Sequence, residues 1–246
     1  MRIALLSDIH ANLEALTACM ADAVARNATR YVFLGDIVGY GADPVACVEI
    51  VRAAAERGAL VVRGNHDEAV ATSSFKLNES AQIAIDWTQT QLRADHIRYL
   101  AGLPLMVAEG SCLYVHASAA NPAKFPYVQS LGDAHASLLA TTASMTFAGH
   151  VHVPALYNLA VTGKTAGFIP LTDVAIPMSS RRRWLAILGA VGQPRDGNPS
   201  AGYGLFDTAT AEITFARVPY DVEKAAAKIR AAGLPENLWK RLASGN

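Results

Sequence analysis

The chain has 246 residues, of which 52% are hydrophobic and 17% are charged, so we expect one domain spanning 1–246 with a large core and little disorder. The chain contains 21 Lys and Arg residues and 21 Asp and Glu residues, so its formal net charge is zero. It therefore lacks the excess of basic residues that is typical of nucleic-acid-binding proteins, and a nucleic-acid partner is not expected. Three scattered cysteines form no Cys-x-x-Cys pair, and no apolar run is long enough to cross a bilayer. These features predict a cytoplasmic protein that does not bind or span a membrane.

The first third of the chain alternates between strand-like and helix-like segments. Short apolar runs predict strands at 2–6, 31–34 and 60–62. Asn12 is a suitable cap for a helix that runs to about residue 26, and Pro44 suits the start of a second helix that ends before Gly58. This β-α-β-α-β order predicts parallel neighbouring strands covered by helices.

The remaining elements change in character along the chain. A helix is predicted at about 79–93, strands at 113–115 and 145–147, and a mixture of loop and helix at 118–143. Later strands without intervening helices are predicted at 184–188, 203–206 and 212–218, followed by helices at 222–231 and 236–243. The inward faces of the helices are predicted to include Leu13, Leu16, Met20 and Val24 in the first and Ile83, Trp87 and Leu92 in the later one.

Short polar motifs close several of these apolar runs. They are Asp8-Ile9-His10, Gly35-Asp36, Gly64-Asn65-His66-Asp67, Val115-His116 and Gly149-His150-Val151-His152. Carboxylate, amide and imidazole groups hold hard to borderline divalent cations, and ligands gather at the carboxyl ends of strands in such sheets. The motifs therefore predict a site for two metals, a common device for displacement at phosphorus, and phosphoester hydrolysis as the activity.

In this order, the motifs resemble those of the calcineurin-like metallophosphoesterase superfamily, in its small bacterial and archaeal branch. The stretches 7–16, 35–41, 192–197 and 218–221 carry the same resemblance, which covers nearly the whole chain. It implies a four-layer α-β-β-α sandwich, in which two mixed sheets lie face to face and are flanked by helices.

The resemblance also implies a role for each motif residue. One metal would be held by Asp8, His10, Asp36 and His152, and the other by Asp36, Asn65, His116 and His150. This mixed shell suits Mn, Fe, Zn, Co or Ni. Two cations sharing Asp36 would generate a hydroxide at neutral pH, and His66 would protonate the leaving group.

The expected partner is a small phosphorylated substrate, such as a nucleotide or a similar molecule. Asn65, His66 and Arg195 are the predicted substrate-binding residues, although a structural salt bridge is an equal alternative for Arg195. The stretches 71–103 and 118–130 are expected to shape the pocket. The sequence leaves the oligomeric state open.

Some features depart from the family pattern. Relatives that are protein Ser/Thr phosphatases carry an Asp-Arg pair where this chain has Val38-Gly39-Tyr40-Gly41. This difference disfavours that activity and leaves the orienting partner of His66 unidentified. A non-catalytic scaffold is a further alternative. For the motif residues themselves, helix capping by the aspartates or burial of core histidines is the competing interpretation. The run 181–183 is either a nucleotide or nucleic-acid contact or a solvated basic loop, and His96 and His135 are expected at the surface.

Overall fold

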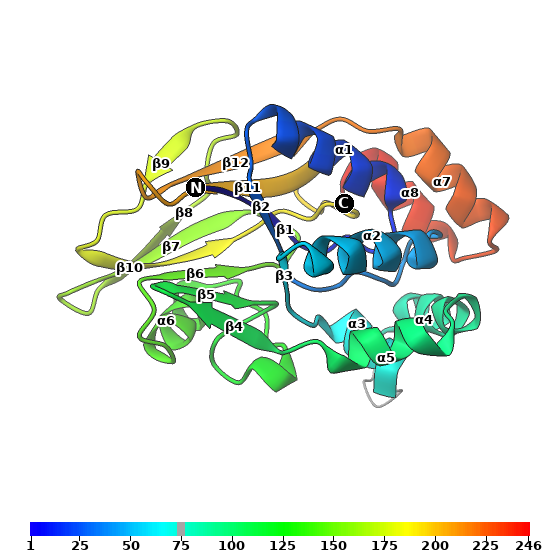
Figure 1. The fold of residues 1–246 in the computed structure, drawn as a ribbon, viewed down its shortest axis with the longest axis horizontal. Helices are drawn as coiled ribbons and strands as arrows, with labels where there is room; N and C mark the ends of the chain where they lie inside the picture. Colours follow the sequence, from blue (N-terminus) through cyan, green and yellow to red (C-terminus); the bar gives the residue numbers. More distant parts are fainter. Residues whose placement is uncertain (73–76) are drawn as a thin grey trace.

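The structure is a computed structural model that describes residues 1–72 and 77–246. Residues 73–76, which belong to the stretch 71–103 that was expected to shape the pocket, lie outside the described residues. Figure 1 shows two sheets stacked on each other, with helices gathered around them.

The first sheet contains the N-terminal strands and is mixed. Its order is β3-β2-β1-β11-β12-β9, where the strands are β1 (Arg2–Leu6), β2 (Arg30–Phe33), β3 (Leu60–Val61), β9 (Ala175–Pro177), β11 (Ala201–Asp207) and β12 (Glu212–Val218). Strands β1, β2 and β3 are parallel, as their alternation with helices predicts. Strands β11, β12 and β9 continue the sheet in antiparallel fashion from β1.

The second sheet is also mixed and delivers the later histidines. Its order is β4-β5-β6-β10-β7-β8, where the strands are β4 (Met106–Glu109), β5 (Cys112–Val115), β6 (Met145–Ala148), β7 (Ala155–Ala160), β8 (Thr165–Phe168) and β10 (Arg182–Ile187). Strands β5, β6 and β10 are parallel, so their carboxyl ends share one edge of the sheet. The predicted pair of mixed sheets is confirmed.

Helices cover both outer faces of this pair and extend beyond one end of it (Figure 1). Helices α1 (Leu13–Ala25) and α2 (Pro44–Glu56) pack on the first sheet, and α6 (Leu131–Leu139) packs on the second. The other helices are α3 (Asn65–Thr72), α4 (Glu79–Gln91), α5 (Ala94–Gly102), α7 (Val222–Ala231) and α8 (Glu236–Ser244). A 3₁₀ turn at Pro122–Lys124 precedes α6. The four-layer sandwich is therefore as predicted.

The main core lies between the two sheets and follows the two-residue period of the strands. In β1, Ile3 and Leu5 face this inter-sheet core, whereas Ala4 and Leu6 face the helices. In the centre, Phe147 is fully buried, and its ring lies 5.6 Å from that of Tyr114 in the same sheet and 5.1 Å from that of Phe206 on β11 of the other sheet. The contact between Phe147 and Phe206 helps to fix how the two sheets stack.

The predicted helix faces are confirmed except at one residue in each helix. In α1, Leu16 is buried and Leu13 and Met20 pack against the core, whereas Val24 is 64% exposed. Toward α4, Leu92 is buried and Trp87 packs against the core, whereas Ile83 is exposed. Small residues, such as Ala23 in α1 and Ala84 in α4, occupy buried positions instead. Within the described residues, no helix is long and apolar enough to cross a membrane.

We expect Phe147→Ala to destabilise the protein by about 3–5 kcal/mol, because it leaves a cavity between the sheets. Phe168→Ala is the matched control, since Phe168 is 47% exposed on β8 and its loss should change stability by no more than about 0.5 kcal/mol. Urea unfolding followed by circular dichroism measures both. Equal shifts for the two variants would contradict the assignment of the core.

Candidate metal centre

The predicted ligands lie where strands of both sheets end. Asp8 follows β1, Asp36 follows β2, and Asn65 begins α3 just after β3, while His116 follows β5 and the last two histidines follow β6. Each of these side chains is at most 5% exposed: Asp8, His10, Asp36, Asn65, His116, His150 and His152. The fold therefore brings all seven predicted ligands to one buried region at the ends of the strands.

Many of these residues have a backbone conformation that L-amino acids rarely adopt. Positive φ angles of 48° to 68° occur at Asp8, His10, Asp36, His150 and His152. Each such conformation costs about 1–2 kcal/mol for a residue with a Cβ. Neighbouring loops hold it in place: the N–H of Asp8 donates to Gly35 O at 3.1 Å, and that of His10 donates to Asp36 O at 2.9 Å. Strain of this kind is typical of functional sites.

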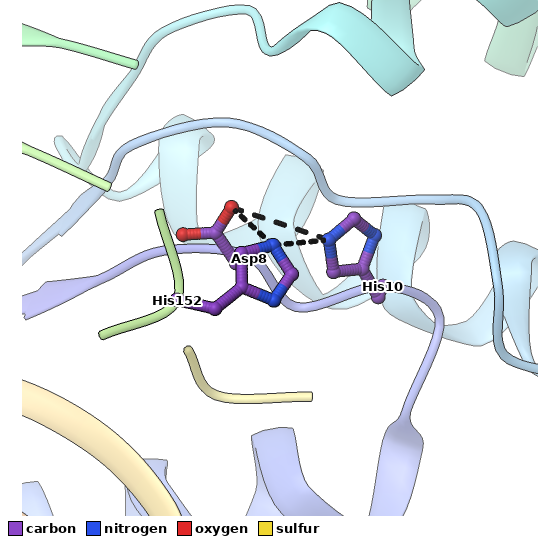
Figure 2. Close-up of side chains that lie close together, drawn as sticks. All are labelled: Asp8, His10 and His152. Carbon is purple, nitrogen blue, oxygen red and sulfur yellow. Dashed lines mark hydrogen bonds and ion pairs between the residues drawn. The ribbon is translucent and has the colours of Figure 1, made fainter. Parts of the chain in front are cut away.

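The first group of ligand atoms consists of Asp8, His10 and His152. Figure 2 shows the three side chains pointing toward one another from two different loops. His152 Nε2 lies 3.2 Å from Asp8 Oδ1 and 3.1 Å from His10 Nε2. Ligand atoms this close together can all reach one cation.

The second group centres on His116. Its Nε2 lies 3.3 Å from Asp36 Oδ2, 3.2 Å from Asn65 Oδ1 and 3.2 Å from His150 Nδ1. The same Asp36 Oδ2 is 3.7 Å from Nε2 of His10, which belongs to the first group. Asp36 therefore lies between the two groups, where a shared ligand would have to lie.

Hydrogen bonds on the outer side of three rings decide which nitrogen faces inward with a lone pair. Nδ1 of each ring faces a backbone carbonyl, at 3.2 Å for His10 (Val38 O), 2.7 Å for His116 (Leu34 O) and 2.6 Å for His152 (Gln193 O). A carbonyl only accepts, so Nδ1 carries the hydrogen and Nε2 of the neutral ring carries the lone pair. Two such lone pairs meet at 3.1 Å between His10 and His152. A cation bound there removes their repulsion, so this donor set fits a divalent metal.

The charge balance of the second group leads to the same conclusion. Burial lowers the pKa of His116, but the adjacent Asp36 carboxylate outweighs it and raises the pKa to about 9. Asp36 itself has a pKa well below its usual value despite its burial, since His116 and His66 lie beside it. The carboxylate therefore requires positive charge at this point, which a metal supplies in place of the proton on His116.

Asp67 is a positioning residue to which the sequence analysis assigned no role. Its Oδ1 accepts the N–H of Ile37 at 2.9 Å, and its Oδ2 accepts that of Gly64 at 3.0 Å, so it joins the loop of Asp36 to the loop of Asn65. Burial and the nearby Asp36 raise the pKa of Asp67 to about 7. The loops approach so closely that a Cβ at Gly64 would lie 2.1 Å from Asp36 Oδ1.

Arg195 lies at the edge of the site without an acidic partner among the described residues. Its guanidinium lies 5.6 Å from the centre of the Tyr40 ring, and its Nη2 donates to Gln193 Oε1 at 2.9 Å. Tyr40 is buried and contacts both His10 and His66, with 4.5 Å between ring centres in each case. The structure thus gives no support to the salt bridge that was the alternative for Arg195.

The other polar features are separate from this centre. His96, expected at the surface, is fully buried, where its ring accepts from Arg93 N–H at 3.3 Å and donates to Glu49 at 2.8 Å. Arg93 in turn pairs with Glu49 at 3.0 Å, so the group is a satisfied ion-pair network between α2 and α5. The basic run 181–183 lies at the start of β10, the end opposite to the ligands, and Arg182 and Arg183 donate to neutral oxygens.

Comparison with known proteins agrees with the geometry. Residues 1–211 match the model of the calcineurin-like phosphoesterase superfamily domain. The chain is 36% identical to an uncharacterised protein of Methanocaldococcus jannaschii, over 99% of this chain and 98% of that protein.

Two solved structures resemble the whole chain. A metallophosphoesterase from Sphaerobacter thermophilus is 38% identical, with a TM-score of 0.88 over 100% of this chain and 99% of that one. A hypothetical protein from Pyrococcus horikoshii is 21% identical and shares the fold, with a TM-score of 0.79 over 100% of this chain and 98% of that one. With its ordered ligand motifs at the strand ends, the chain belongs to the calcineurin-like phosphoesterase superfamily.

Proposed function

We propose that the protein hydrolyses phosphate esters of a small molecule with the help of two divalent metal ions. The observation that carries the proposal is the position of the Asp36 carboxylate between two groups of inward-facing lone pairs. Asp8, His10, Asp36 and His152 would hold one ion, and Asp36, Asn65, His116 and His150 the other. Such ions, when bound, neutralise phosphate charge and activate water. Mn, Fe, Zn, Co and Ni all suit this mixture of ligands.

His66 is the proposed proton donor to the leaving group. Its backbone N–H donates to Asp36 Oδ1 at 2.8 Å, so the residue is fixed directly to the shared ligand. Burial lowers the pKa of His66 to about 4, so the ring is neutral in the free protein at pH 7. A bound phosphate dianion beside it favours the protonated form. Under this proposal, His66 takes up its proton together with the substrate and then passes it to the departing oxygen.

Packing holds the His66 ring in position, since this chain lacks the Asp that orients the corresponding ring in related phosphoprotein phosphatases. Nδ1 of His66 is buried without a hydrogen-bond partner in the described structure. The ring lies against Gly39, where a Cβ would be 2.4 Å from Nδ1, and against the rings of Tyr40 and His10. Gly39 and Tyr40 would therefore orient His66 by contact, a role that the Asp of the Asp-Arg pair has in related phosphoprotein phosphatases. This favours a small-molecule esterase over a protein phosphatase.

Arg195 is proposed to bind the substrate phosphate together with Asn65 and His66. It is a cation at the edge of the centre, and its Nε is buried without a partner in the described part of the chain. Unpaired buried donors favour an anionic ligand, and guanidinium groups match phosphate geometry.

Metal content gives the first test. We expect the native protein to bind about two Mn²⁺ per chain, and His152→Ala and His116→Ala to bind about one each, because each variant damages one ligand group. Equilibrium dialysis with elemental analysis measures this. His135→Ala is the matched control, since His135 lies outside both groups and forms a hydrogen bond with the Thr165 hydroxyl. A single ion in the native protein would exclude the two-metal proposal.

Turnover gives the second test. We expect hydrolysis of bis-p-nitrophenyl phosphate or p-nitrophenyl phosphate in Mn²⁺ but not in EDTA, and a loss of about 10²- to 10⁴-fold in kcat for His66→Ala. The preference between the two esters distinguishes a diesterase from a monoesterase. Metal binding without turnover of any ester would instead support a non-catalytic scaffold.

The role of Gly39 gives the third test. Both Gly39 (φ +88°) and Gly58 (φ +95°) have left-handed backbones, so an alanine at either should destabilise the protein by about 1–2 kcal/mol. Gly39→Ala also displaces His66 and should lower kcat by about 100-fold. Gly58→Ala should leave kcat unchanged, since nothing lies within 4 Å of its added methyl group. Similar kcat values for the two variants would show that His66 is not oriented by this contact.

A further inference from the structure

Tyr127 is an exposed aromatic residue that lies directly on the metal centre. Its ring stacks on that of His150, with 4.1 Å between ring centres and 22° between planes. Nevertheless 49% of the residue is exposed, although large aromatic side chains are ordinarily more buried. One side of Tyr127 thus contacts a ligand of the proposed metals while the remainder is open to solvent.

The loop that carries Tyr127 is anchored on both sides of it. Phe125 is buried and lies edge-on against the ring of His116, at 5.9 Å. Val128 is buried in the core beneath α6. Phe125 also has φ +47°, an unfavourable conformation for a bulky residue, which the anchors maintain. This construction keeps an apolar ring at the surface in one defined position.

A positive charge lies at the same centre as this ring. Tyr127 stacks on His150, and the Arg195 guanidinium lies 5.6 Å from the centre of the Tyr40 ring, which packs against His66. A ligand whose phosphate reaches Arg195 and the metals would therefore place the group beyond its phosphate near Tyr127.

From this arrangement we propose that Tyr127 is a stacking platform for a nucleobase, so that the substrates are nucleotide esters. The binding of the phosphate at the metal centre rests on the proposed function, whereas the binding of the base is inferred from the position of Tyr127. A planar heterocycle would extend the existing stack of His150 and Tyr127, and base–aromatic stacking of this kind tolerates different bases. The proposal names a specificity-determining residue outside the ligand motifs.

The test compares two ligands that differ only in the base. The Mn²⁺-loaded protein is titrated calorimetrically with AMP and with ribose 5-phosphate, each checked for phosphate release so that the dissociation constant refers to the intact ester. We expect AMP to bind more tightly than ribose 5-phosphate. Tyr127→Ala should weaken AMP binding by about 5- to 150-fold and leave ribose 5-phosphate binding unchanged. Tyr127→Phe, which keeps the ring, should retain the preference for AMP.

Other results would overturn the proposal. If Tyr127→Ala weakens both ligands equally, the ring only supports His150. If the native protein binds the two ligands equally, or Tyr127→Ala leaves AMP binding unchanged, no base contacts this ring. A preference for AMP that depends on Tyr127, without hydrolysis of any phosphate ester, would leave the platform intact and refute the proposed activity instead.

Discussion

The architecture of the site depends on one buried carboxylate. Asp36 is 1% exposed, and an ionised carboxylate at such a position is strongly destabilising unless positive charge and hydrogen bonds compensate for it. The structure supplies the His66 N–H on one oxygen and the Nε2 atoms of His10 and His116 around the other. These groups come from three separate segments of the chain, so the site exists only when both sheets are assembled.

The inter-sheet core and the strained loops act together on that carboxylate. Tyr114 and Phe147 stack in the core, on the two neighbouring strands that lead to His116 and His150. The loops beyond the strands then hydrogen-bond to one another, and Gly149 N–H donates to His116 O at 2.8 Å. The rigid core and the strained loops above it hold side chains close together even though the lone pairs of these side chains repel one another. Preorganisation of this kind is what a metal site requires.

The gathering of the candidate ligands at the strand ends could be predicted from the sequence, because each motif follows a strong apolar run and has a distinctive residue order. The parallel strands and most helix bounds were predicted for the same reason. Strands β4, β7, β8 and β9 were not predicted, since they are short or border the sheet edges, where exposed positions interrupt the pattern. The contacts of Asp67 and Tyr127 could not be inferred, because they join segments far apart in the chain. His96 was wrongly placed because a buried ion pair leaves no periodic signal.

The C-terminal helices support the site although they lie outside the part of the chain that matches the family model. The match ends at residue 211, before α7 and α8 begin. Both helices nevertheless share a core with Tyr40, the residue that packs against His66 and His10. Gly197 N–H also donates to Gly245 O at 2.8 Å, which connects the chain end to the loop of Arg195. The helices thus support the two residues that, in our proposal, orient the proton donor and bind phosphate, and changes in them would alter catalysis without touching a ligand.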